Sequence, residues 1–235
     1  MSGKSFKRTI KDLSPVLFHP PVGGPEDKRA VYEVKRGRPL QNLKIRYDET
    51  TIFPGLLGRE LPKTFGHYHP KNPAGVYYPE IFGVLGGRAW YLLQKPDPKN
   101  PKIIKEVYLA EVKEKEKAVM PPGFGHVSLN PENKKLEMAN WIGSDFDYDY
   151  QTYENLRGGC YYLLESKNGQ TVDFEKNYYY EKVPPLMKVR PKEIPELGIK
   201  WNIPLSKLGP EKLEFLLKPE KYLEILTIKN CFKRM

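Results

Sequence analysis

The sequence predicts an all-β protein built as a sandwich or a barrel. Its apolar runs are short and rich in Val, Ile, Tyr and Trp, and Gly, Pro, Asn and Asp separate them, which is the pattern of antiparallel strands joined by turns. No run is followed by a long amphipathic helix, so a parallel α/β sheet is disfavoured. The 235 residues suffice for one large domain, or for one domain with extensions.

Three segments are predicted along the chain. Residues 1–30 are rich in turns, and we expect them to form an arm that lies across the core. Residues 31–195 form the predicted barrel domain, in which "SKNGQTVDF" places an Asn-Gly turn between two strands of a hairpin. The other strand-like runs of this domain are "AVYEV", "NLKIRY", "TTIFPG", "EIFGVL", "RAWYLLQ", "IIKEVYLAEV", "KAVMPPG", "LEMANWIG" and "CYYLLE".

The last segment, residues 196–235, is predicted to be a short helical extension. Leucine and aromatic residues in "GPEKLEFLLKPEKYLEIL" are spaced for one or two short helices. Pro219 divides them, because proline lacks the backbone N–H and clashes with the preceding turn. This apolar extension and the exposed sheet edges predict a homodimer.

Charge and cysteine content limit the classes of partner and the cellular compartment that we expect. The formal net charge is +10, but lysine and glutamate alternate and no arginine-rich run with interleaved aromatics occurs, so we expect no nucleic-acid partner. Cys160 and Cys231 form no CxxC pair, which favours a reducing compartment. No apolar run approaches the roughly 20 residues that span a bilayer. We therefore expect a cytoplasmic protein without a membrane partner.

Three of the four histidines fall in two motifs. His67 and His69 are two positions apart, so on a strand both imidazoles point to the same side. Glu80 heads an apolar strand after a Pro/Gly loop and can fold back beside them, and His126 follows a Pro-Pro-Gly turn. Three imidazoles and a carboxylate suit Fe(II), Mn(II), Zn(II) or Ni(II) with coordination positions left open. His19 lies outside both motifs and is interpreted as a loop residue.

The motifs resemble the cupin superfamily and, more narrowly, the cupin-type glucose-6-phosphate isomerases found mainly in archaea. The resemblance covers roughly residues 30–180 and rests on "TTIFPG", "TFGHYHP", "YPEIFGVLGGRAWYLLQ", "MPPGFGHVSLN" and "DYDY", in that order. It implies a double-stranded β-helix (the cupin jelly-roll barrel) and an aldose-ketose isomerase of glycolysis and gluconeogenesis that interconverts glucose 6-phosphate and fructose 6-phosphate. It also implies one divalent metal ion per subunit on His67, His69, Glu80 and His126. Fe(II) is the first expectation, and Mn(II), Ni(II) and Zn(II) are alternatives.

The resemblance also implies a phosphate site. The matching residues are Thr64, Gly66 and either Thr50 or Thr51. Small hydroxyls and a backbone N–H beside a glycine suit phosphate, because the backbone can approach the oxygens closely. These residues predict a phosphorylated sugar as the substrate.

Further site residues follow from the same resemblance. In "DYDY", Tyr148 stands where the family has a histidine, and Tyr150 matches the tyrosine that neighbours it. Both are catalytic candidates beside Glu80. Trp141 matches, with a shift of one residue, an aromatic residue that holds the phosphate or sugar. Phe82 stands where the family commonly has tyrosine, and the gap between the second histidine and the glutamate is longer than in most cupins.

Isomerisation moves a proton or a hydride between C1 and C2 of an open-chain sugar. In a cis-enediol route Glu80 is the available base, and a metal on O1 and O2 stabilises the oxyanion. A metal-assisted hydride shift stays open. Two other functions also stay open: another enzyme on the same fold (a dioxygenase, an epimerase or a mannose-type isomerase) and a non-catalytic sugar-binding module.

Overall fold

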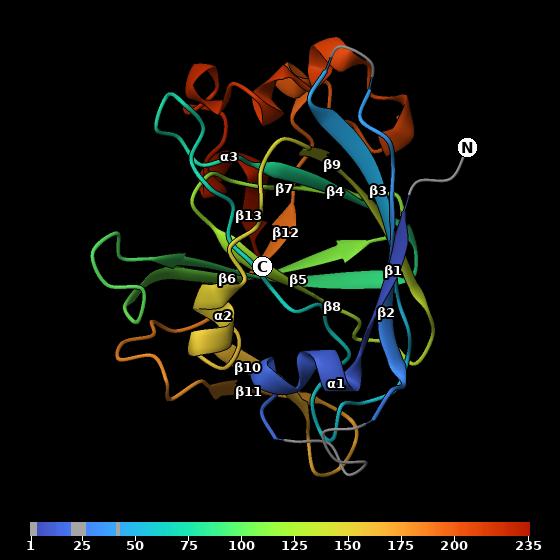
Figure 1. The fold of residues 1–235 in the computed structure, drawn as a ribbon, viewed down its shortest axis with the longest axis vertical. Coiled ribbons are helices and arrows are strands. Elements are labelled where there is room, and N and C mark those ends of the chain that lie inside the picture. The colour runs from blue at the N-terminus through green and yellow to red at the C-terminus, as the bar shows by residue number, and fades with distance from the viewer. Residues whose placement is uncertain (1–3, 20–26, 41–42) are drawn as a thin grey trace.

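Two β-sheets pack face to face and form the jelly-roll barrel (Figure 1). The computed structural model describes residues 4–19, 27–40 and 43–235. The first sheet contains, in spatial order, β1 (Ser5–Thr9), β2 (Ala30–Arg36), β3 (Ile45–Ile52), β9 (Leu136–Gly143), β4 (Glu80–Gly86) and β7 (Lys117–Met120). The second contains β13 (Phe232–Arg234), β12 (Met187–Pro191), β6 (Ile104–Lys113), β5 (Arg88–Pro96) and β8 (Gly125–Leu129). The predicted all-β jelly-roll fold is confirmed.

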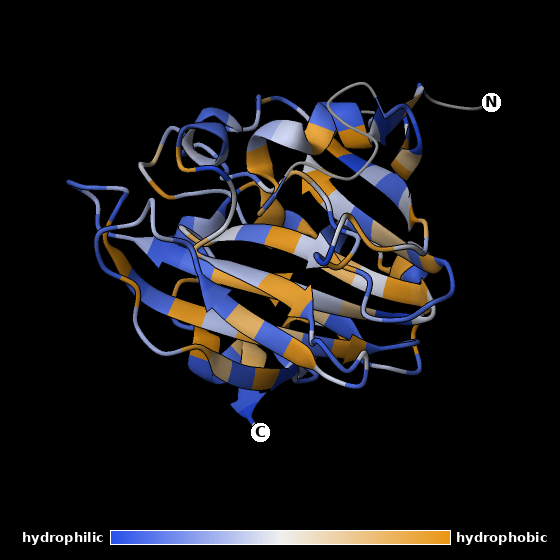
Figure 2. Ribbon diagram, turned by 90° about the horizontal axis from the view of Figure 1, so that it is seen from below, coloured by the Kyte–Doolittle hydropathy of each residue, from blue (hydrophilic) through white to orange (hydrophobic). Residues whose placement is uncertain are grey.

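Pairing within both sheets is antiparallel, except between β12 and β6, which run parallel. Strand β3 unites the two predicted runs "NLKIRY" and "TTIFPG" into one strand. Hydrophobic and hydrophilic residues alternate along many strands (Figure 2), as expected when one face of a sheet is buried. Asn42, in the first of those runs, lies outside the described residues, as do residues 1–3 and 20–26 of the predicted arm.

The predicted hairpin forms beside the barrel. Strands β10 (Tyr161–Glu165) and β11 (Val172–Lys176) pair antiparallel and form a separate two-stranded sheet. The predicted glycine of the turn, Gly169, has φ +69°. The helix α2 (Gln151–Asn155) precedes this hairpin and follows the "DYDY" segment.

The described part of the arm contributes to the barrel. Strand β1 pairs with β2, and Thr9 then caps the helix α1 (Ile10–Leu13), which the 3-10 helix η1 (Ser14–Val16) follows. At the other end of the chain, β13 pairs with β12. Strands from both outer segments therefore belong to the sheets of the barrel. The division into residues 1–30, 31–195 and 196–235 stays a prediction.

Residues 196–235 are helical only in short turns. Their helices are η3 (Leu205–Lys207), η4 (Pro210–Lys212), η5 (Glu214–Leu216), η6 (Pro219–Lys221) and α3 (Ile228–Cys231), and η2 (Pro195–Leu197) precedes them. Pro219 begins η6 and separates it from η5, as predicted. Prolines at the starts of η2, η4 and η6 recur too often for a longer helix to form.

This extension covers the outer face of the first sheet. The indole Nε1 of Trp141 on β9 donates to the Leu205 carbonyl at 2.9 Å. Gly83 on β4 makes room for the Leu205 side chain, since a Cβ there would lie 3.2 Å from it. Leu213, Phe215 and Leu216 are fully buried in the same core. The extension is therefore part of the folded unit.

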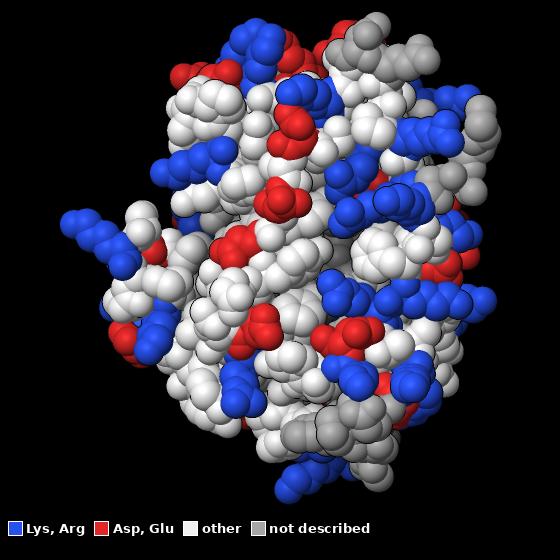
Figure 3. All heavy atoms as spheres, in the orientation of Figure 1, with Lys and Arg blue, Asp and Glu red and all other residues white. Residues whose placement is uncertain are grey.

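Both charge signs are present on the face shown in Figure 3, and basic side chains gather on its right, over β1 and its neighbours. Among the described residues, no helix is long and apolar enough to cross a membrane.

Truncating the buried aromatic residue of the extension tests this packing. We expect Phe215→Ala to lower the free energy of unfolding by about 3–5 kcal/mol, because it removes a ring from a closed core. Leu223→Ala on the same extension, where the side chain is 47% exposed, is expected to change stability by less than about 1 kcal/mol. Urea denaturation measures both, and equal effects would show that the extension does not pack on the barrel.

Candidate metal centre and its cavity

Residues 63–68 hold the first histidine beside β8. They pair with that strand through isolated bridges, including His67 with His126, and do not form a continuous ladder. Gly66 interrupts the pairing with φ +86°, and a Cβ there would lie 2.6 Å from the Tyr153 ring, so only glycine fits. The predicted alternation is confirmed: the Nε2 atoms of His67 and His69 lie 3.1 Å apart.

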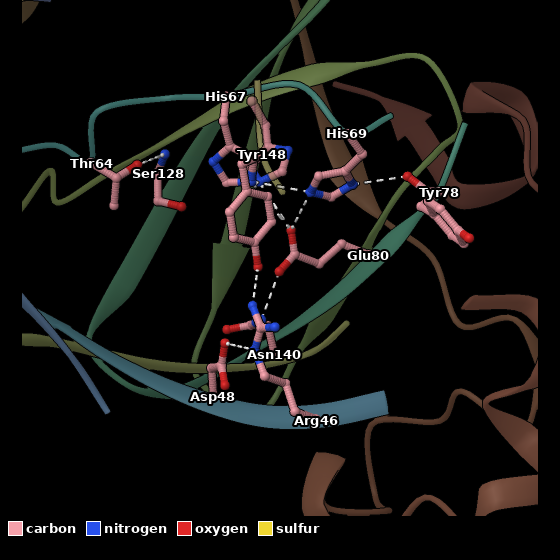
Figure 4. Close-up of polar contacts among 11 residues, drawn as sticks. Arg46, Asp48, Thr64, His67, His69, Tyr78, Glu80, Ser128, Asn140 and Tyr148 are labelled. Carbon is pink, nitrogen blue, oxygen red and sulfur yellow. Dashed lines mark hydrogen bonds and ion pairs between the residues drawn. The ribbon is translucent and has the colours of Figure 1, made fainter. Parts of the chain in front are cut away.

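Three imidazoles converge on one carboxylate oxygen, Oε2 of Glu80 (Figure 4). Glu80 Oε2 lies 3.2 Å from His126 Nε2, 3.4 Å from His69 Nε2 and 4.0 Å from His67 Nε2. The ligand atoms of the four residues all lie within 4.8 Å of one another. The structure thus brings together all four residues of the predicted metal site.

The two oxygens of Glu80 have different surroundings. Asn140 on β9 donates its Nδ2 to Oε1 at 2.7 Å, whereas Oε2 is buried and has no hydrogen-bond partner. Burial disfavours the ionised carboxylate, but hydrogen bonds and positive charge from the proton-bearing forms of His126 and His69 outweigh it and lower the pKa of Glu80 to about 2. Glu80 is therefore ionised at neutral pH, with one oxygen turned toward three imidazoles.

The imidazoles are held in the form that binds metal. Burial lowers the pKa of His67 and of His126, so both rings are neutral at pH 7. The Nδ1 of His69 lies 2.9 Å from the Tyr78 carbonyl, which can only accept, so Nδ1 carries a proton and Nε2 is the nitrogen turned toward the cluster. Neutral imidazole and ionised carboxylate are the forms that ligate metals, so these residues fit a divalent cation.

The cluster opens onto a cavity between the sheets. The cluster residues His67, Glu80 and His126 line it. Three residues predicted to bind phosphate line it as well: Thr50, Thr64 and Gly66. The Thr64 hydroxyl oxygen accepts from the backbone N–H of Ser128 at 3.0 Å, so its own proton stays available to a ligand.

Two predicted substrate residues, Thr51 and Trp141, are not among those that line this cavity. Each is next in sequence to a residue that does, because neighbouring residues of a strand point to opposite faces. Thr51 follows the lining residue Thr50 on β3, and Trp141 follows Asn140 on β9. Their assignment to the substrate stays a prediction that the placement does not favour.

The two predicted tyrosines also line the cavity. The Tyr148 ring lies 4.3 Å from the His67 ring between centroids, and the Tyr150 ring lies 5.5 Å from it. Burial raises the pKa of both phenols, so both keep their protons at neutral pH. Phe82, where the family commonly has tyrosine, lines the same cavity with its ring centroid 5.4 Å from that of His126.

Three residues around the cluster were not predicted from the sequence as site residues: Arg46, Asp48 and Asn140. Arg46 donates its Nη2 to the Tyr148 hydroxyl at 2.5 Å and pairs through Nε with Asp48 at 2.8 Å (Figure 4). A signal was present in "IRYDET", where Arg46, Asp48 and Thr50 alternate on one face of a strand. Charged residues on an inward face indicate a polar cavity.

The comparisons with known proteins agree with this geometry. The glucose-6-phosphate isomerase (GPI) family model matches residues 7–181. This chain belongs to the glucose-6-phosphate isomerase family. Within that family, the glucose-6-phosphate isomerase of Thermococcus litoralis is 23% identical over 72% of this chain and 75% of the relative. The Pyrococcus abyssi glucose-6-phosphate isomerase is 24% identical over 71% of this chain and 75% of the relative. The resemblance drawn from the motifs is confirmed.

Solved structures match over a smaller part of the chain. An oxalate oxidase in complex with glycolate is 18% identical, with a TM-score of 0.37 over 48% of this chain and 51% of that one. A cupin 2 conserved barrel domain protein from Rhodopseudomonas palustris is 11% identical, with a TM-score of 0.34 over 49% of this chain and 63% of that one. By comparison, the family model matches residues 7–181 of this chain. This range includes the whole His/Glu cluster and ends before the C-terminal extension.

Removing one imidazole tests the metal centre. We expect His126→Ala to lose most of its bound divalent metal, because the buried cluster keeps only three of its four donors. His19→Ala is the matched control, since His19 is exposed and lies outside the cluster. Metal analysis by mass spectrometry after dialysis measures both variants. Equal metal content in the two would contradict the site.

Proposed function

We propose that the chain interconverts glucose 6-phosphate and fructose 6-phosphate at a divalent metal bound by His67, His69, Glu80 and His126. The observation that carries the proposal is the convergence of four donor atoms within 4.8 Å, in a chain of the glucose-6-phosphate isomerase family. The cavity beside them also carries the hydroxyls and the glycine predicted to bind phosphate. Fe(II) is the first candidate, with Mn(II), Ni(II) and Zn(II) as alternatives.

The protein's own residues provide binding, orientation and proton transfer. When bound, the metal supplies an electrophile that stabilises negative charge on a sugar oxygen. Glu80, ionised and fixed by Asn140, is the proposed base for the proton at C1 or C2. Tyr148, held by Arg46, keeps a hydroxyl in the cavity. In the alternative route a hydride passes directly between C1 and C2, so no hydrogen from the solvent enters the product.

The phosphate is proposed to bind at Thr50, Thr64 and Gly66. All three line the cavity, and the Thr64 hydroxyl keeps a proton to donate to a phosphate oxygen. Gly66 has no side chain to obstruct its backbone, and φ +86° lets the chain turn there. The rim formed by Tyr148 and Tyr150 helps to exclude water from the metal.

Metal removal tests the proposed function. We expect chelation followed by dialysis to abolish isomerisation of fructose 6-phosphate, and Fe(II), Mn(II) or Ni(II) to restore it. A coupled assay of glucose 6-phosphate formation, run beside metal analysis of the same samples, measures this. Full activity without metal would contradict the proposal. Bound metal without turnover would move the protein to another reaction on this fold or to a sugar-binding module.

A homodimer and a cytoplasmic location belong to the same proposal. The outer strands β1, β7 and β13 leave sheet edges that a second copy could cover. Light scattering is expected to give about twice the chain mass of 27.3 kDa at micromolar concentration. A particle with the mass of one chain would remove the dimer.

A further inference from the structure

One arginine lines the cavity without taking part in the interactions described above. Arg36 is the last residue of β2, and its guanidinium carbon lies 5.2 Å from the ring centroid of Phe6 and 5.9 Å from that of Tyr148. All three residues line the cavity that contains the metal cluster. The guanidinium therefore contacts aromatic rings, which leave the N–H groups along its edge available for hydrogen bonds.

Arg36 has no carboxylate partner among the described residues. No ion pair of its side chain occurs in this part of the chain, and its Nε is buried without a hydrogen-bond partner. The two carboxylates that line the cavity are otherwise engaged. Asp48 pairs with Arg46, and Glu80 binds Asn140 and faces the imidazoles. A buried cationic donor without a partner costs stability, so such a group in a cavity indicates an anionic ligand.

The position of Arg36 relates it to the phosphate residues. On β2 and β3, Val34 lies opposite Thr50 and Arg36 lies opposite Asp48. Arg36 is thus one step along the same inner face from Thr50, a distance that a long side chain can span. Thr50, Thr64 and Gly66 offer only neutral donors, whereas a sugar phosphate carries up to two negative charges.

We propose that Arg36 is the cationic anchor that binds the phosphate of the substrate and selects phosphorylated over unphosphorylated sugars. This inference rests on the proposed function for the identity of the substrate. A guanidinium edge can give a phosphate two parallel hydrogen bonds, which the neutral donors cannot replace. Arg36 also balances charge. A divalent ion beside ionised Glu80 leaves one positive charge, and Arg36 adds a second, so together they offset the two negative charges of a phosphate dianion.

The test compares Arg36→Gln with Arg36→Lys and with a matched control. Arg38→Gln removes an exposed arginine two residues away that does not line the cavity. For Arg36→Gln we expect the KM for fructose 6-phosphate to rise by about 10- to 100-fold with a smaller change in kcat, the effect of losing a charge-assisted hydrogen bond. Arg36→Lys is expected to recover part of the loss, and Arg38→Gln to match the wild type. Metal content and thermal melting confirm that each variant is folded.

A binding experiment separates this inference from the proposed function. Calorimetric titration of the metal-loaded protein with inorganic phosphate needs no turnover, and we expect Arg36→Gln to bind about tenfold or more weakly than the wild type. If the wild type fails to isomerise fructose 6-phosphate but shows this difference, the proposed function fails and the anion site stands. Equal phosphate affinity and an unchanged KM in Arg36→Gln would overturn the role of Arg36.

Discussion

A single buried oxygen, Glu80 Oε2, determines the chemistry of this barrel. It belongs to an ionised carboxylate, lies within 4.0 Å of three imidazole nitrogens and has no hydrogen-bond partner. A buried charge without compensation is unfavourable by several kcal/mol. Burial keeps His67 and His126 neutral at pH 7, so neither ring brings a positive charge to offset that of the carboxylate. A divalent cation would satisfy all four donors at once, because coordination bonds would replace the mutual repulsion of their lone pairs.

The jelly roll supplies these donors from both sheets. Glu80 begins β4 in the first sheet, whereas His126 lies on β8 in the second. His67 bridges directly to His126 on β8, and His69 follows two residues later. A metal at this point would link the two layers of the barrel. Arg46 on β3 fixes the tyrosine above the cluster, so the cavity is polar at the metal and aromatic around it.

Sequence alone could predict the four residues of the His/Glu cluster, because they are rare residue types in local motifs. It could not decide which of two neighbouring strand residues faces inward, because a shift of one residue reverses the face. Thr51 and Trp141 show this: each adjoins a residue that lines the cavity. Arg36 and Asn140 were missed because only strand pairing brings them to the cluster. The strand Phe232–Arg234 is too short to be predicted from its sequence pattern, and it is recognised only by its pairing with β12.

Anomalous diffraction from crystals of the metal-loaded protein, recorded at the absorption edge of the bound metal, tests the central claim most directly. The account predicts one strong peak per chain, about 2.0–2.3 Å from the Nε2 atoms of His67, His69 and His126 and from Glu80 Oε2. An active, metal-containing protein whose anomalous peak lies away from these four residues would contradict it.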